Sequence, residues 1–176
     1  MRFAGAVDPL RAADLAVNDL GAQLLAQCAP TIKKTSMELG GNAPFIVFDD
    51  ADLDAAVAGA VASKYRNAGQ TCVCTNRFLV QDGVYDAFAA KLKAAVAKLK
   101  VGNGLDEGVT IGPLINPDAV EKVREHIADA VEHGASVLLG GKPDALGGNF
   151  FTPTILTDVP RTAKIFREET FGPVAP

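Results

Sequence analysis

The chain has 176 residues, 48% of them hydrophobic, and a formal net charge of −4 at pH 7. A chain of this length removes roughly 70% of its unfolded surface from water, so it can form one compact domain. The acidic balance offers no basic surface to phosphates, which argues against nucleic acid as a partner. Apolar runs are too short to cross a bilayer, and acid and proline interrupt the N-terminus early. We therefore expect a cytoplasmic protein with no membrane partner.

The first half of the chain is predicted to form two helices and three strands. Apolar residues recur every three or four positions where helices are expected, whereas the strands show alternation or a short continuous apolar run. In chain order these elements are a helix over residues 9–28, a strand over 31–39, a strand over 44–48, a helix over 52–66 and a strand over 77–80.

The second half continues the alternation of strands and helices. Asn116 and Pro117 are typical of a helix start, and Gly134 is typical of a helix end. The elements are a helix over residues 84–99, a loop over 102–108, a helix over 116–134, a strand over 137–139 and an extended segment over 150–159. Strands that alternate with helices of this length predict an α/β fold with a mostly parallel sheet and flanking helices.

Nucleotide and metal motifs do not fit the chain. The glycines of residues 102–108 are spaced one position too far for a dinucleotide fingerprint and follow a helix. Gly141-Lys142 lacks the glycine five residues earlier that a phosphate loop needs. His126 and His133 are two helical turns apart, so no metal site is expected.

The three cysteines differ in their surroundings. Cys28 ends an apolar helical stripe and is expected to be a packing residue. Cys72 and Cys74 lie in a polar loop after glycine, where a thiolate can attack a substrate. Glu38 precedes two glycines, and a partly desolvated carboxylate there could act as a general base. The local residues are also consistent with a Cys72 that lies in the loop without a catalytic role and with a Glu38 that is only solvated.

Three segments, residues 37–44, 67–72 and 168–173, resemble in order and spacing the signatures of the aldehyde dehydrogenase superfamily. The resemblance extends over residues 21–176. It implies that Cys72 is the nucleophile and Glu38 the base. It also implies that Glu169 and Phe171 hold the nicotinamide ribose of NAD or NADP. The partner would be a small aldehyde, oxidised to an acid through a cysteine thioester.

Residues 64–67 and Cys72-Val73-Cys74 resemble the branch of the family that oxidises succinate semialdehyde. By this resemblance Arg66 binds the distal carboxylate of the substrate through two parallel hydrogen bonds. Glutarate semialdehyde is the alternative, because a guanidinium does not measure chain length strictly. Arg66 could instead meet the carbonyls at its own helix end. Cys74 could form a reversible disulfide with Cys72 or be a packed bystander.

Members of this family are much longer than this chain. The resemblance therefore implies an unmatched segment over residues 1–20, a remnant of the dinucleotide-binding domain over 21–39, and a catalytic domain over 40–176 that is truncated at its C-terminal end. It implies a homo-oligomer at full length and no measurable activity for the chain alone. The family's oxyanion asparagine and ribose lysine have no counterpart here. An inactive folding or assembly module is the competing hypothesis.

Overall fold

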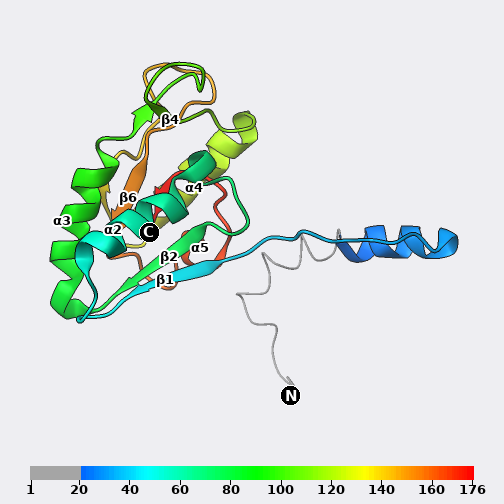
Figure 1. Cartoon of the computed structure of the whole chain (residues 1–176), viewed down its shortest axis with the longest axis horizontal. Helices are drawn as coiled ribbons and strands as arrows, with labels where there is room; N and C mark the ends of the chain where they lie inside the picture. Colours follow the sequence, from blue (N-terminus) through cyan, green and yellow to red (C-terminus); the bar gives the residue numbers. More distant parts are fainter. Residues whose placement is uncertain (1–20) are drawn as a thin grey trace.

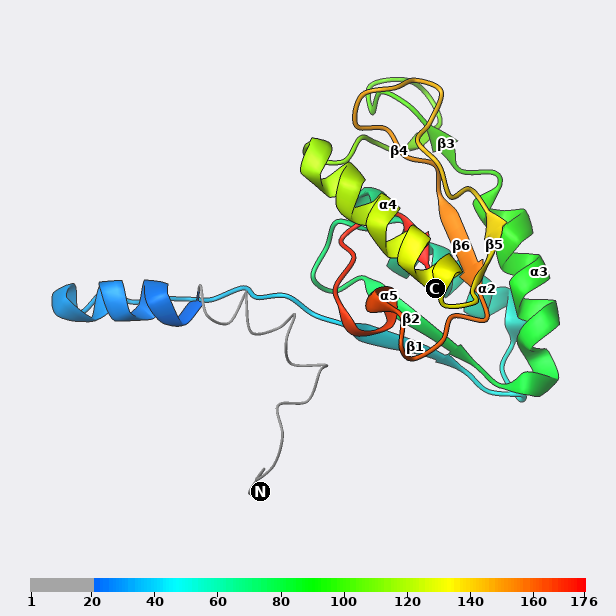
Figure 2. The same ribbon diagram turned by 180° about the vertical axis from the view of Figure 1, so that it is seen from behind.

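The structure is a computed structural model that describes residues 21–176. The segment assigned to residues 1–20 and the first part of the helix predicted over 9–28 lie outside the described residues. The rest of that helix is present over residues 21–28, followed by the 3-10 turn η1, Ala29–Thr31. Figures 1 and 2 show this helix on an extended arm that stands apart from the body of the molecule.

The arm contradicts two expectations. The strand predicted over residues 31–39 is wrong: no strand forms there, because no neighbouring strand pairs with it. Ile32 is 90% exposed and has a left-handed φ of 51°, which interrupts an extended course.

Cys28 is only partly buried, and Leu24 and Leu25 on the same helix are exposed. Their apolar stripe covers no core within the described chain, so the packing role expected of Cys28 is wrong.

The strands of the body lie mostly in parallel pairs, as the predicted α/β class requires. The strand predicted over residues 77–80 is confirmed as part of β2, and the extended segment over 150–159 contains β6. Two short strands, β3 and β4, flank the glycine loop, and β7 near the C-terminus has no counterpart among the predicted elements. The strands are β1 (Ala43–Val47), β2 (Thr75–Val80), β3 (Lys100–Val101), β4 (Val109–Ile111), β5 (Ser136–Leu139), β6 (Thr154–Thr157) and β7 (Val174–Ala175). The pairs β1/β2, β3/β4 and β6/β7 are parallel, whereas β5 and β6 are antiparallel.

Two of the helices begin at side-chain caps, and the cap at Asn116 was predicted. Asp52 accepts hydrogen bonds from Asp54 N and Ala55 N, and Asn116 accepts one from Ala119 N. The helices are α2 (Leu53–Lys64), η2 (Arg66–Gly69), η3 (Asp82–Val84), α3 (Tyr85–Val96), α4 (Pro117–Glu132) and α5 (Lys164–Arg167). The helices predicted over residues 52–66, 84–99 and 116–134 correspond to α2, α3 and α4, whereas the one-turn helix α5 was not predicted.

The core lies between the strands and the helices on both sides of them. Helix α2 is toward the viewer in Figure 1, and α4 comes to the front when the molecule is turned around in Figure 2. On one side the rings of Phe45 and Phe78 lie 5.4 Å apart, and Phe88 of α3 lies 6.3 Å from Phe78. On the other side α4 buries Val123 and His126. None of the helices in residues 21–176 is long and apolar enough to cross a membrane.

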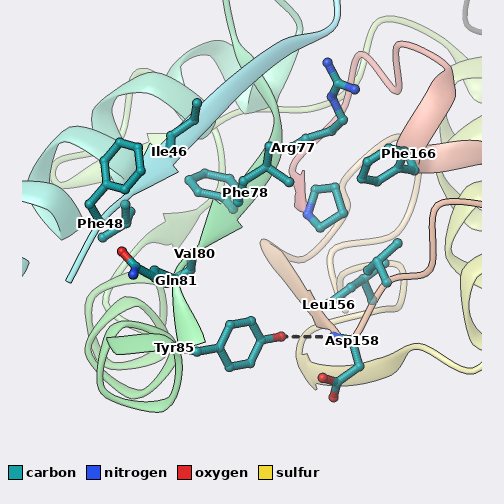
Figure 3. A pocket seen from close by; sticks show the side chains of 14 residues that line it. Ile46, Phe48, Arg77, Phe78, Val80, Gln81, Tyr85, Leu156, Asp158 and Phe166 are labelled. Atoms are coloured by element: carbon teal, nitrogen blue, oxygen red, sulfur yellow. Dashed lines mark hydrogen bonds between the residues drawn. The ribbon is translucent and has the colours of Figure 1, made fainter. Parts of the chain in front are cut away.

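A hollow of about 490 Å³ opens between β2 and β6, beside the end of β7. Phe78 N donates to Pro176 O at 2.9 Å and so joins β2 to the residue after β7. Figure 3 shows Tyr85 reaching across the hollow, where its hydroxyl accepts a 3.0 Å hydrogen bond from Asp158 N, and the Arg77 side chain beside the ring of Phe166. None of the site residues predicted from the sequence lines this hollow.

Candidate active site

A second hollow, of about 450 Å³, joins three segments that are far apart in the sequence. They are the end of the arm, the loop after η2 and the segment after α5. Four residues singled out by the sequence line it together, namely Glu38, Cys72, Glu169 and Phe171. Leu39, Gly40, Gln70 and Thr71 complete the lining. The structure thus gathers the predicted nucleophile, base and cofactor residues around one space.

The loop that carries Cys72 has an unusual backbone. Asn67, Ala68 and Gly69 have left-handed φ angles of 52°, 54° and 74° in succession. Non-glycine residues rarely adopt this region, and such strain gathers at functional sites. Asn67 and Gln70 stabilise the turn, because each side-chain amide donates to the backbone carbonyl of the other, at 3.0 and 3.2 Å. Cys72 follows, partly exposed at the rim of the hollow.

Two further contacts anchor this loop. Tyr65, which caps the end of α2, donates its hydroxyl hydrogen to Thr154 O on β6 at 2.8 Å. Burial raises the pKa of Tyr65 well above its usual range, so the hydroxyl stays a donor. At the other end, the side chain of Gln70 accepts a hydrogen bond from Ile115 N at 2.9 Å. The loop that carries Cys72, the predicted nucleophile, is therefore held between the sheet and the chain before α4.

Gly41 is where the three segments meet. Its N–H donates to Glu169 Oε1 at 3.3 Å, and its carbonyl accepts from Asn76 Nδ2 at 3.2 Å. A Cβ at Gly41 would lie only 2.7 Å from the carbonyl oxygen of Cys72. Because only glycine allows this approach, Gly41 brings the chain that carries Glu38 against the Cys72 loop.

The segment after α5 presents Glu169 and Phe171 to the hollow. Phe171 has a left-handed φ of 55° and remains 38% exposed. The side-chain amide of Asn42 donates to the carbonyls of Phe166 and Arg167, at 3.4 and 3.1 Å, and so ties α5 to the start of β1. Glu169 thus faces Gly41 from a segment whose N-terminal end, at α5, is tied to the start of β1 by Asn42.

Lys64 is a buried charge beneath the site that sequence reasoning missed. Its side chain is fully buried, and its Nζ makes no hydrogen bond within the described chain. Desolvation lowers the pKa of Lys64 to about 8, against the opposing influence of Cys74 and Glu169. A lysine in the last turn of a helix is usually solvated, so nothing in the pattern indicated burial.

Arg66 and Cys74 do not line the hollow. Arg66 is exposed at the start of η2, and its guanidinium makes no hydrogen bond or ion pair with residues 21–176. It does not meet the carbonyls at its own helix end. Cys74 is a free thiol with 2% exposure, packed below the loop. Among the described residues no cluster of three or more metal-ligating side chains is present.

Comparison with known proteins gives one consistent result. The sequence pattern of the aldehyde dehydrogenase family matches residues 17–176. The chain is 72% identical over 158 residues to a glutarate-semialdehyde dehydrogenase of Pseudomonas aeruginosa, and 70% identical over 158 residues to an NADP-dependent succinate-semialdehyde dehydrogenase of Escherichia coli. Each match covers 90% of this chain and 33% of the relative. The chain therefore spans about a third of the length of these relatives.

The solved structures agree with this. The crystal structure of succinate-semialdehyde dehydrogenase from Burkholderia pseudomallei superposes with a TM-score of 0.86 at 66% identity. That match covers 90% of this chain and 33% of the solved one. The fold of the described body is therefore that of the corresponding part of an aldehyde dehydrogenase.

Gly69→Ala tests the close packing of the Cys72 loop. The added Cβ would lie 2.1 Å from Gly172 O, at a residue whose φ is +74°. We expect the free energy of unfolding in urea to fall by about 2 kcal/mol or more. Gly104→Ala is the matched control, because no atom lies within 4 Å of its Cβ position, and it should change stability by less than about 0.5 kcal/mol. Equal effects would mean that the approach of Gly69 to Gly172 does not constrain the fold.

Lys64→Met tests the buried charge. The pKa of Lys64 falls from 10.5 to about 8 in the folded state, so between these values the unfolded chain binds more protons and stability rises with pH. At pH 7 the protonated amine of Lys64 lowers the stability of the folded state by its full desolvation penalty. The variant should therefore unfold with a free energy up to about 3 kcal/mol higher there, and its advantage should shrink as the pH rises from 8 to 10.

The control for this experiment is Lys98→Met, which removes an exposed lysine. It should leave the pH dependence of the free energy of unfolding unchanged. If Lys64→Met and Lys98→Met give the same profile as the parent chain between pH 7 and 10, the amine of Lys64 is not desolvated in solution.

Proposed function

This chain belongs to the aldehyde dehydrogenase family, and we propose that it supplies the nucleophile and base of an enzyme that oxidises succinate semialdehyde to succinate with NAD or NADP. The observation that carries the proposal is the shared hollow of Cys72, Glu38 and Glu169, which come from three distant segments. A thiol, a carboxylate and an oriented backbone around one space are what acyl transfer through a cysteine requires.

Cys72 begins the reaction. Its thiolate adds to the carbonyl carbon of the aldehyde and forms a carbon–sulfur bond, while the carbonyl oxygen takes the negative charge. The backbone N–H of Cys72 is a donor for that oxygen, on a loop whose strained turn is already formed before substrate binds. When bound beside Glu169 and Phe171, a nicotinamide would supply the acceptor for the hydride of the substrate carbon, and Cys72 would then hold the acyl group as a thioester.

Glu38 completes the cycle. Its carboxylate is exposed at the end of the arm and lines the same hollow as Cys72. It takes a proton from water, the resulting hydroxide attacks the thioester carbon, and the Cys72 thiolate leaves as the carbon–sulfur bond breaks. The product is a carboxylic acid. Hydrolysis of the thioester makes the oxidation irreversible.

The residues that line the hollow fit a nicotinamide ribose. The carboxylate of Glu169 accepts a hydrogen bond from Gly41 N and lines the hollow, and Phe171 lines the same hollow and is partly exposed. A carboxylate accepts hydrogen bonds from ribose hydroxyls, and an aromatic face packs against the sugar. We assign these two residues to the cofactor. NAD and NADP stay alternatives, although one relative is named for NADP.

We propose that residues 40–176 belong to the catalytic domain and that residues 21–39 belong to the dinucleotide-binding part of the parent enzyme. Two observations support this division. Residues 40–176 form the packed body, whereas the helix over 21–28 stands away from it with most of its residues exposed. The chain also spans a third of the length of its relatives. Turnover by this chain alone is therefore not expected, and a cytoplasmic homo-oligomer is the form we propose for the whole enzyme.

Glutarate semialdehyde is the second candidate substrate. The relative from P. aeruginosa carries this activity in its name, at an identity close to that of the E. coli succinate-semialdehyde dehydrogenase. Both substrates carry a distal carboxylate. The free guanidinium of Arg66 suits either of them, because it has no competing acceptor in residues 21–176.

Arg66→Ala tests the substrate class in an enzyme of the relatives' length that carries this segment. Loss of the guanidinium leaves the substrate carboxylate without its hydrogen bonds, which should lower kcat/KM for succinate semialdehyde by a factor of about 10 to 100. Arg66→Lys should recover only part of the loss, because an ammonium lacks the planar two-donor fork.

Butanal is the control substrate, since it has no carboxylate to lose. Its kcat/KM should change far less in both variants, so the ratio of the two specificity constants is the measured quantity. An equal fall for both aldehydes would show that Arg66 supports the Cys72 loop and does not select the substrate.

A further inference from the structure

His126 is a buried titratable residue that the proposed reaction does not use. It lies in the middle of α4 with 1% exposure, on the face that also buries Val123, Ile127 and Ala130. An imidazole this deeply buried must satisfy both ring nitrogens. Each ring nitrogen of His126 therefore needs a partner within the fold.

Both partners of His126 come from the segment that presents Glu169. His126 Nδ1 lies 3.1 Å from the hydroxyl of Thr170, which is itself buried, and Nε2 lies 3.4 Å from Glu168 Oε2. One neutral tautomer serves both contacts: Nε2–H donates to the Glu168 carboxylate, and Nδ1 accepts from the Thr170 hydroxyl. The His126 ring thus contacts Glu168, the residue before Glu169, and Thr170, the residue after it.

The same face of α4 contacts this segment a second time. Val123 is three residues before His126, so the two side chains are neighbours on the helix. A Cβ at Gly172 would lie 2.4 Å from Val123 Cγ2. Between Thr170 and Gly172, Phe171 has a left-handed φ of 55°. A strained residue persists only where its surroundings hold it, and here α4 provides the contacts on both sides of it.

We propose that His126 is a positioning residue, which holds the segment Glu168–Phe171 so that Glu169 faces Gly41 and the hollow. The inference deepens the proposed function in one respect, because that function gives Glu169 and Phe171 to the cofactor. The geometry itself involves neither cofactor nor substrate. The hydrogen bond from Gly41 N to Glu169 Oε1 reports directly whether the segment is in place.

Charged groups from each neighbouring element determine when the ring is neutral. Burial is the main cause that lowers the pKa of His126, and Lys122 on α4 adds to it, whereas Glu168 and Glu125 oppose it. Lys164 of α5 pairs with Glu125 and so occupies that carboxylate. The ring is therefore neutral at pH 7. On protonation Nδ1 becomes a donor, and the Thr170 hydroxyl must turn to accept from it.

The test follows the backbone amide of Gly41 by NMR in the 176-residue chain from pH 7.5 to 5. We expect a chemical-shift transition whose midpoint coincides with that of the His126 ring and lies below the ordinary histidine value of about 6.5. In His126→Asn the amide oxygen replaces the acceptor at Nδ1 without titrating, so the transition should disappear. A residue that only filled space would leave the Gly41 amide insensitive to the protonation of the ring.

His133→Asn is the matched control, because His133 is the other histidine of the chain and lies exposed at the C-cap of the same helix. The Gly41 transition should survive in it. The inference is overturned if His126 titrates while the Gly41 amide does not respond, or if the transition persists in His126→Asn. If His126→Asn does not fold, the two midpoints in the unsubstituted chain decide: coincidence supports the inference and separation overturns it. Neither readout uses turnover, so the proposed function can fail or stand independently.

Discussion

Three close approaches of backbone at glycine hold the site together. A Cβ at Gly41 would lie 2.7 Å from Cys72 O, one at Gly69 would lie 2.1 Å from Gly172 O, and one at Gly172 would lie 2.4 Å from Val123 Cγ2. Any side chain at these points would push the segments apart. The segments that carry Glu38, Cys72 and Glu169 share one hollow because backbone meets backbone at Gly41 and at Gly69, whereas Gly172 packs against the Val123 side chain of α4.

Several energetically costly features lie at this site, although left-handed φ angles also occur at Ile32 and Asp158 outside it. Asn67, Ala68 and Phe171 have left-handed φ angles, and all three lie within the segments that form the site. Lys64, at the end of α2 just before Asn67 and Ala68, is fully buried with no hydrogen bond in the described chain. Strain and a desolvated charge lower stability, and they persist where surrounding contacts determine the geometry. The anchors of Tyr65 on β6 and His126 on α4 are the contacts that do so here.

Local patterns predicted most of the longer helices and strands, and the chemistry they suggest for the Cys72 loop stays a prediction. Helix α4 follows Asn116 and Pro117 because capping chemistry is local. The continuous apolar run of residues 44–48 does contain strand β1, but Ile46 is 54% exposed, so the run is not explained by burial of both faces within the described residues. The strand expected over residues 31–39 fails because alternation says nothing about a pairing partner. Lys64 and His126 were missed for the same reason, because groups beside them are distant in the sequence. Glu169, whose charge acts on Lys64, lies in the segment after α5, and Thr170 is 44 residues from His126.

In the proposed reaction Cys72 carries the acyl group and Glu38 releases it. An enzyme of the relatives' length that carries this segment with Glu38→Gln, mixed with succinate semialdehyde and NADP, tests both roles in one measurement. Mass spectrometry of the digested protein should find a succinyl thioester on the peptide of Cys72, accumulated because water is no longer activated. Reduced cofactor formed without any adduct on Cys72, or an adduct on Cys74 in its place, would contradict the account.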